Sequence, residues 1–104
     1  MKEFIVRGKT YRIKKMNAIE VLALKQHVDF EHFNGTYEFF KLVLERVEYK
    51  MNESQWLPVR EVKDKLVNYY PSGIEEDIDS LNEIIQTFMD WLKSVFQKSS
   101  ESKE

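Results

Sequence analysis

The sequence predicts an α+β fold that is mainly α-helical, in which an N-terminal β-hairpin packs on a small bundle of three to four helices. Three observations predict this fold: apolar and polar residues alternate on both sides of a glycine near the N-terminus, a helix-capping sequence follows, and a long amphipathic stretch lies near the C-terminus. The 104 residues, 42% of them hydrophobic, suffice for one modest core. We therefore expect a single domain over residues 1–96 and a disordered polar tail over 97–104.

The first element is a hairpin from Glu3 to Lys14. We place its turn at Gly8-Lys9, since glycine readily supplies the positive φ of a two-residue turn. This register pairs Val6 with Tyr11 and Phe4 with Ile13, and it puts these four apolar residues on one face. A lone hairpin is only marginally stable, so that face should rest on helices.

Two helices should follow. Asn17 and Glu20 fit a capping box that starts the first, whose apolar residues lie on more than one side, as in a helix enclosed by neighbours. It should end before the Asn34-Gly35 turn signal. The second should run from Tyr37 to about Val47.

The middle of the chain is harder to interpret. Residues 48–60 are compatible with a second short hairpin, whose strand containing Pro58 would have to lie at a sheet edge. Residues from Glu61 to Tyr69 suggest a short helix instead.

The stretch from Ser72 to Phe96 predicts one long amphipathic helix, with Asp77 in its first turn, where a carboxylate suits the helix dipole. Its apolar residues fall within an arc of roughly 160° at about 100° per residue. They are Ile74, Ile78, Leu81, Ile84, Ile85, Phe88, Met89, Trp91, Leu92, Val95 and Phe96.

This helix carries the candidate binding site. Packing inside the core explains much of its pattern, but the distal half adds bulky residues that so small a chain can hardly cover. We therefore predict a surface for a partner protein, or for self-association, formed by Phe88, Trp91, Leu92, Val95 and Phe96.

No motif for catalysis, a cofactor or a metal is apparent. The chain lacks cysteine, its three glycines are isolated, and its two histidines, His27 and His32, are five residues apart, off a common helix face. We therefore expect no enzyme, no cofactor and no metal. No run of residues is apolar enough to span a membrane, and no signal peptide is apparent, so we expect a cytoplasmic protein.

Charge argues against nucleic acid as the first choice of partner. Lysine plus arginine number 16 against 18 acidic residues, and only Arg12, Lys14 and Lys15 form a basic group. The alternative interpretation is nevertheless that the chain is a small helical regulatory protein, which binds nucleic acid or a transcription factor.

Several stretches together resemble the tail assembly chaperones of long-tailed phages and prophages. They are Phe4–Ile13, Lys15–Glu20, Trp56–Val59, and the pattern from Ile74-Glu75 through Trp91-Leu92 to Val95-Phe96 with its serine-rich tail. The resemblance implies a small, non-enzymatic, mainly helical protein of the host cell cytoplasm.

It also implies the partner. Members of that family bind the tape measure protein and keep it soluble while tail-tube subunits polymerise around it. The resemblance therefore implies the tape measure protein as client and the tail-tube protein as a second candidate partner. Self-association is compatible with the apolar surplus, and neither nucleic acid nor a membrane is expected.

Overall fold

The structure of the protein is a computed structural model that describes residues 3–26 and 37–101. Its elements follow in this order along the chain: β1 (Glu3–Val6), β2 (Lys9–Ile13), α1 (Ala18–Lys25), α2 (Tyr37–Arg46), β3 (Val47–Asn52), β4 (Gln55–Pro58), β5 (Arg60–Lys63), β6 (Leu66–Tyr69), the 3-10 turn η1 (Ile74–Glu76) and α3 (Ile78–Glu101).

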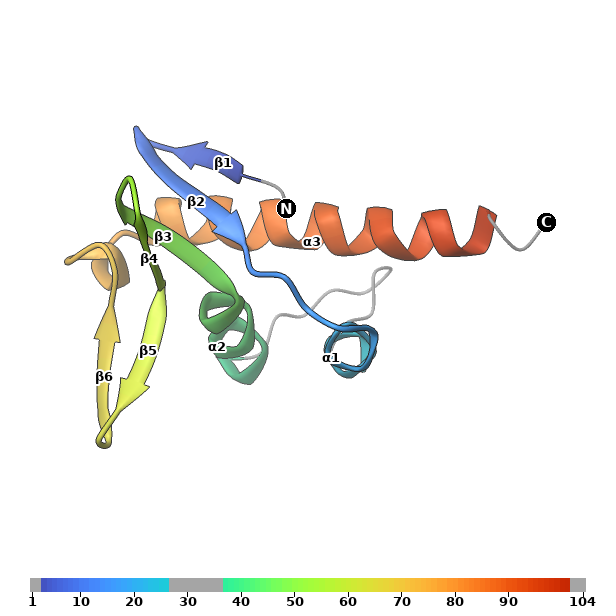
Figure 1. The fold of residues 1–104 in the computed structure, drawn as a ribbon, viewed down its shortest axis with the longest axis horizontal. Coiled ribbons are helices and arrows are strands. Elements are labelled where there is room, and N and C mark those ends of the chain that lie inside the picture. The colour runs from blue at the N-terminus through green and yellow to red at the C-terminus, as the bar shows by residue number, and fades with distance from the viewer. Residues whose placement is uncertain (1–2, 27–36, 102–104) are drawn as a thin grey trace.

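The predicted fold, mainly helical with a hairpin on a bundle of three to four helices, is wrong. Within the described residues, strands β1-β2-β3-β4 form an antiparallel sheet in that order, and β5-β6 form a second, two-stranded sheet (Figure 1). The discrepancy arises in residues 47–69, which supply four strands. The N-terminal hairpin and the long C-terminal helix are present.

The N-terminal hairpin has the predicted faces but a different register. Its turn is Arg7-Gly8, with φ of 49° and 82°, and Phe4 pairs with Tyr11 rather than with Ile13. Two positive φ values in succession suit a type I′ turn, in which glycine is most useful at the second position. The register differs from the predicted one by two residues, and such a shift leaves every side chain on its original face.

The next strands extend this sheet. β3 pairs with β2 through Tyr11 and Tyr49, and it also pairs with β4. The second short hairpin considered for residues 48–60 is thus confirmed, and Pro58 lies in β4 at the edge of the sheet. Proline lacks the N–H that an inner strand must donate, so the edge is where it can be accommodated.

The predicted helix from Glu61 to Tyr69 is wrong. These residues belong to the β5–β6 hairpin, in which Val62 pairs with Val67. Its turn residues, Asp64 and Lys65, both have positive φ, 51° and 67°. Aspartate tolerates this conformation better than most residues do, but without a glycine the turn is hard to recognise.

The long helix begins at Ile78 rather than near Ser72, because Gly73, with φ of 89°, and the turn η1 precede it. Asp77 is therefore the cap of α3 and not a first-turn residue. Its carboxylate accepts hydrogen bonds from the backbone N–H of Ser80 (3.2 Å) and from the Ser80 hydroxyl (2.6 Å). α3 runs to Glu101, so the tail predicted from residue 97 begins within this helix, and residues 102–104 lie outside the described part.

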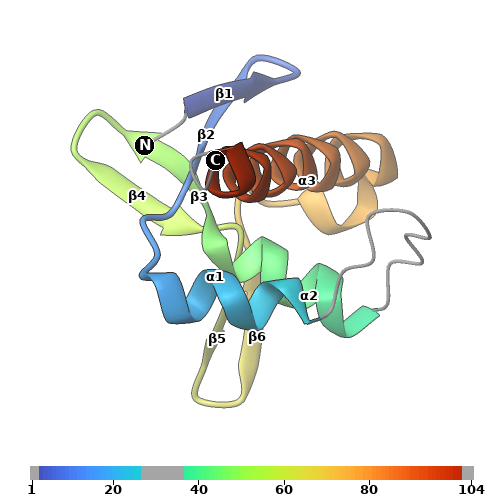
Figure 2. The ribbon, with the colours of Figure 1, turned by 90° about the vertical axis from the view of Figure 1, so that its right-hand side faces the viewer.

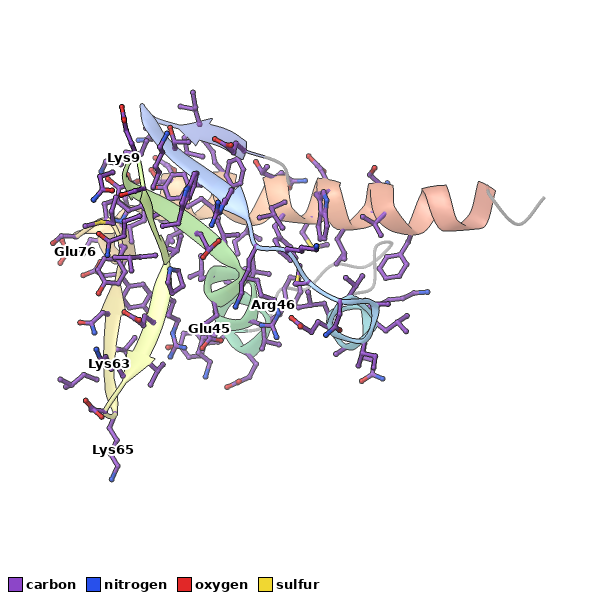
Figure 3. All side chains as sticks on the ribbon, viewed as in Figure 1. Lys9, Glu45, Arg46, Lys63, Lys65 and Glu76 are labelled. Carbon is purple, nitrogen blue, oxygen red and sulfur yellow. The ribbon has the colours of Figure 1, made fainter. Side chains whose placement is uncertain are left out.

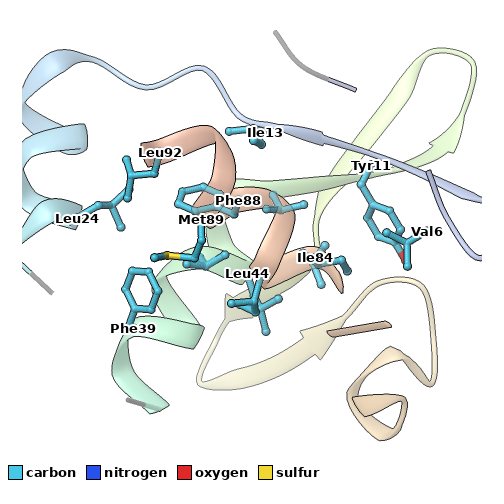
Figure 4. Packing of buried hydrophobic residues seen from close by; sticks show 14 of the residues in the cluster. Val6, Tyr11, Ile13, Leu24, Phe39, Leu44, Ile84, Phe88, Met89 and Leu92 are labelled. Atoms are coloured by element: carbon cyan, nitrogen blue, oxygen red, sulfur yellow. The ribbon is translucent and has the colours of Figure 1, made fainter. Parts of the chain in front are cut away.

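Helix α3 lies between the β1–β2 hairpin on one side and α1 and α2 on the other (Figures 1 and 2). The core therefore forms around it, as the close view in Figure 4 shows. The buried apolar residues are Val6, Tyr11, Ile13, Leu24, Phe39, Val43, Leu44, Val47, Val59, Ile74, Ile84, Ile85, Phe88, Met89 and Leu92. Every described element except β4, β5 and β6 contributes to this cluster.

Candidate protein-binding surface

The predicted binding residues of α3 are divided between the core and its margin. Phe88 and Leu92 are fully buried, whereas Trp91, Val95 and Phe96 are half-buried. In Figure 4, Leu92 lies beside Leu24 of α1. Phe88 and Leu92 are therefore part of the core, and the five residues do not form a continuous exposed strip.

The margin of this group is itself partly covered. The Trp91 ring packs against Phe88 with centroids 5.6 Å apart, and the ammonium of Lys25 lies 4.7 Å from the centre of the Phe96 ring. Aromatic rings attract a cation over their face, so this contact ties the end of α1 to α3. α1 thus covers part of the apolar surplus that the sequence indicates on α3.

Helix α1 instead has an uncovered apolar side. Ile19 is 78% exposed and Leu22 is 55% exposed, while Leu24 on the opposite side is 1% exposed. Apart from Lys25, the exposed residues of α1 and its C-cap follow helical spacing on one face and will be called the outer stripe. The outer stripe consists of Ala18, Ile19, Leu22, Ala23 and Gln26.

The local sequence explains why α1 stands where it does. The Asn17 side chain accepts a hydrogen bond from the backbone N–H of Glu20 (2.9 Å), which confirms the predicted N-cap. The backbone N–H of Lys14 donates to the carbonyl of Arg46 (2.8 Å), so the segment that enters α1 is tied to the end of α2. α1 then crosses the distal part of α3 (Figure 2). It thus buries one side, and the prediction of a helix enclosed by neighbours is wrong for its outer stripe.

The charge around the outer stripe differs from that of the whole chain. Residues 14–26 contain three lysines, Lys14, Lys15 and Lys25, and one acidic residue, Glu20, so their net charge is +2. The full chain carries −2. The three lysines are exposed, two of them before the helix and one at its last residue. An apolar stripe with basic residues at both ends is therefore the most distinctive surface of α1.

The β5–β6 hairpin also exposes several apolar side chains close together. Val62 and Val67 lie opposite each other, 51% and 45% exposed, while Leu66 is 68% exposed and pairs with Lys63 on the other face. Lys63 and Lys65 are at the projecting end of this hairpin (Figure 3). Because its apolar residues are divided between two faces, the hairpin presents no continuous stripe comparable to that of α1.

The predicted basic group does not remain together. Arg12 forms an ion pair with Glu48 (2.8 Å) and stacks on Trp56 at 4.2 Å, within the sheet, whereas Lys14 and Lys15 lie beyond the end of β2. A guanidinium that is already paired with a carboxylate has less to offer a phosphate. Lys14 and Lys15 thus belong with the surroundings of α1.

Arg7, in the turn of the first hairpin, faces the acidic start of α3. Its guanidinium lies 3.4 Å from Asp79, 3.9 Å from Glu83 and 4.0 Å from Asp77. The hydrogen bonds from Ser80, with the nearby guanidinium of Arg7, lower the pKa of the Asp77 carboxyl below its usual 3.8. These ion pairs join the first hairpin to the start of α3, so a structural role explains the charged cluster.

Among the titratable groups of residues 3–26 and 37–101, Tyr11 has the most strongly shifted pKa. Burial, together with the neighbouring Tyr49 and Asp77, raises the pKa of its hydroxyl to about 12. The hydroxyl has no hydrogen-bond partner among the described groups, and its ring packs between Phe4 and Tyr49, with centroids 5.8 and 5.6 Å away. It is therefore a core residue that stays protonated at neutral pH.

In residues 3–26 and 37–101, no cluster of histidine, cysteine, aspartate or glutamate is placed to hold a metal ion. His27 and His32 lie outside the described residues. No described helix combines the length and the apolar character required to cross a bilayer.

No protein-family model, curated protein or solved structure matches this chain. Its function has therefore to be inferred from its surfaces and from the resemblance noted in its sequence.

Proposed function

We propose that this protein is a non-enzymatic assembly chaperone of a long-tailed phage or prophage, which binds the tape measure protein and keeps it soluble while the tail tube polymerises. The resemblance of its sequence to that family supports the proposal. The observation that carries it in the structure is the outer stripe of α1, whose central residues Ile19 and Leu22 are exposed. Aliphatic side chains gathered on one helix face suit contact with an apolar client.

The site differs from the strip expected on α3. Phe88 and Leu92 are core residues, so the client surface that we propose is centred on Ile19 and Leu22 of α1. Leu92 and Phe96 of α3 support it from behind, through Leu24 and Lys25 of α1. α3 then holds the binding helix in place rather than binding the client itself.

The physical basis of this activity is burial of apolar surface. Burial contributes about 25 cal/mol per Å² before the costs of association. The stripe covers about two helical turns, so a single contact is weak and easily reversed. Weak contacts repeated by several copies along one long client would protect it and still yield to the tube subunits.

Co-expression with overlapping fragments of the tape measure protein tests the function. The wild-type chain should increase the soluble fraction of at least one fragment. If no fragment becomes more soluble across the whole client, the proposed function is wrong.

Paired variants then test the surface. Ile19→Gln with Leu22→Gln should remove most of the gain in client solubility without unfolding the domain. The matched control is Val62→Thr with Val67→Thr on the β5–β6 hairpin, which also removes two exposed apolar groups and should leave the gain unchanged. If only the hairpin variant loses the gain, the client binds the hairpin and not α1.

A further inference from the structure

We infer that the outer stripe of α1 receives an amphipathic helix whose apolar face is bordered by acidic side chains. This inference rests on the proposed function and specifies which segments of the client are bound. It follows from two independent features of the same surface: the helical spacing of its exposed apolar residues and the sign of the charges at its two ends.

The spacing indicates the shape of the occupant. Ile19, Leu22 and Ala23 lie three and four residues apart along α1. Their side chains form a ridge that fits into a groove on the surface of a second helix. An extended strand would need main-chain donors and acceptors from its host, and the backbone of α1 uses its own within the helix. A helix is thus the occupant that the ridge suits best.

The charges indicate the sequence of the occupant. Lys14 and Lys15 precede the stripe, and Lys25, an exposed residue whose ammonium lies over the Phe96 ring, is near its other end. Glu20, half-buried, is the acidic residue of this segment. A helix flanked by glutamate or aspartate would meet opposite charge at both ends of α1, while a helix flanked by lysine would be repelled. This complementarity lets the protein discriminate among the many apolar helices of a long client.

A titration of the ¹⁵N-labelled full chain with two designed helical peptides tests this inference. The peptides share one leucine stripe, which is bordered by glutamates in the first and by lysines in the second. The glutamate peptide should shift the amide resonances of residues 18–26 and bind at least about fivefold more tightly at low salt. The difference should nearly vanish at about 0.5 M salt, where screening is short-ranged.

Two charge variants sharpen the test. Lys14→Gln with Lys15→Gln should reduce the preference for the glutamate peptide. Lys63→Gln with Lys65→Gln, which removes the same charge from the far hairpin, should preserve it (Figure 3). Equal loss in both variants would show that only net charge matters, and the inference would be overturned.

Other occupants give different results, each of which overturns the inference. Equal binding of both peptides, no binding, or shifts confined to β5 and β6 would exclude an acidic helix on α1. Stripe-dependent sedimentation with phosphatidylserine vesicles would indicate a membrane surface, and a dimer that Ile19→Gln with Leu22→Gln dissociates would indicate a second copy. If tape measure fragments are solubilised and the glutamate peptide does not bind, this inference fails while the proposed function stands.

Discussion

Helices α1 and α3 both carry more apolar side chains than one buried face requires, yet they differ in how much of the surplus is covered. α3 has neighbours on several sides, and five apolar residues at its centre are at most 8% exposed: Ile84, Ile85, Phe88, Met89 and Leu92. α1 rests on its neighbours with Leu24 and leaves Ile19 and Leu22 exposed. The number of packed neighbours, rather than the length or the apolar content of a helix, thus determines which helix has surface left for a partner.

The largest expected effect is at the centre of α3. Phe88→Ala should lower the free energy of unfolding by about 3–5 kcal/mol, because it leaves a cavity where the side chain is fully buried. Ile19→Ala on α1 should change it by only about 0.5 kcal/mol. Urea denaturation of both variants measures the contrast.

If Phe88→Ala does not fold at all, Phe88→Leu offers a milder test. It should still lower the free energy of unfolding more than Ile19→Ala does. A loss at Ile19 as large as that at Phe88 would contradict the comparison, since it would mean that the outer stripe is buried in solution.

A smaller effect is expected at the cap of α3. Asp77→Ala removes the acceptor for both the N–H and the buried hydroxyl of Ser80, so it should lower the urea midpoint at neutral pH, by less than Phe88→Ala does. The folded pKa of Asp77 is below 3.8, and its contribution is therefore present above that pH and is lost as the pH falls through the folded pKa.

The difference between the wild type and Asp77→Ala should accordingly shrink as the pH is lowered below about 4. Asn17→Ala at the cap of α1 is the matched control, because an amide does not titrate. It should cost about 1 kcal/mol or less, independently of pH. A constant difference for Asp77→Ala across this range would contradict the assigned role of the carboxylate.

Local signals in the sequence predicted part of this fold. The cap at Asn17, the apolar face of the first hairpin and the edge position of Pro58 follow from side-chain chemistry within a few residues, and the structure has all three. The register of the hairpin was not accessible in this way, because a shift by two residues preserves its faces. The β5–β6 hairpin was missed because its turn, Asp64-Lys65, contains no glycine.

The candidate surface was harder to predict, because it depends on which elements pack together. The sequence shows apolar residues on two sides of α1 and a surplus of apolar side chains on α3, but it does not show which of them other elements cover. Strands β5 and β6 replace the short helix that was predicted from Glu61 to Tyr69. With fewer helices, α3 becomes the central element and α1 a peripheral one, which reverses the exposure expected for Phe88 and Ile19.

The smallest expected effect on stability is that of Ile19→Gln with Leu22→Gln. Glutamine forms helices about as well as leucine and slightly better than isoleucine, and both side chains are largely exposed. The free energy of unfolding should therefore change by no more than about 0.5 kcal/mol, measured by urea denaturation at two protein concentrations. A loss of several times this size that grows with protein concentration would show that a second copy covers the outer stripe, because only association makes stability depend on concentration. An unchanged midpoint at both concentrations, combined with loss of client solubility, would separate the binding surface of α1 from the core around α3.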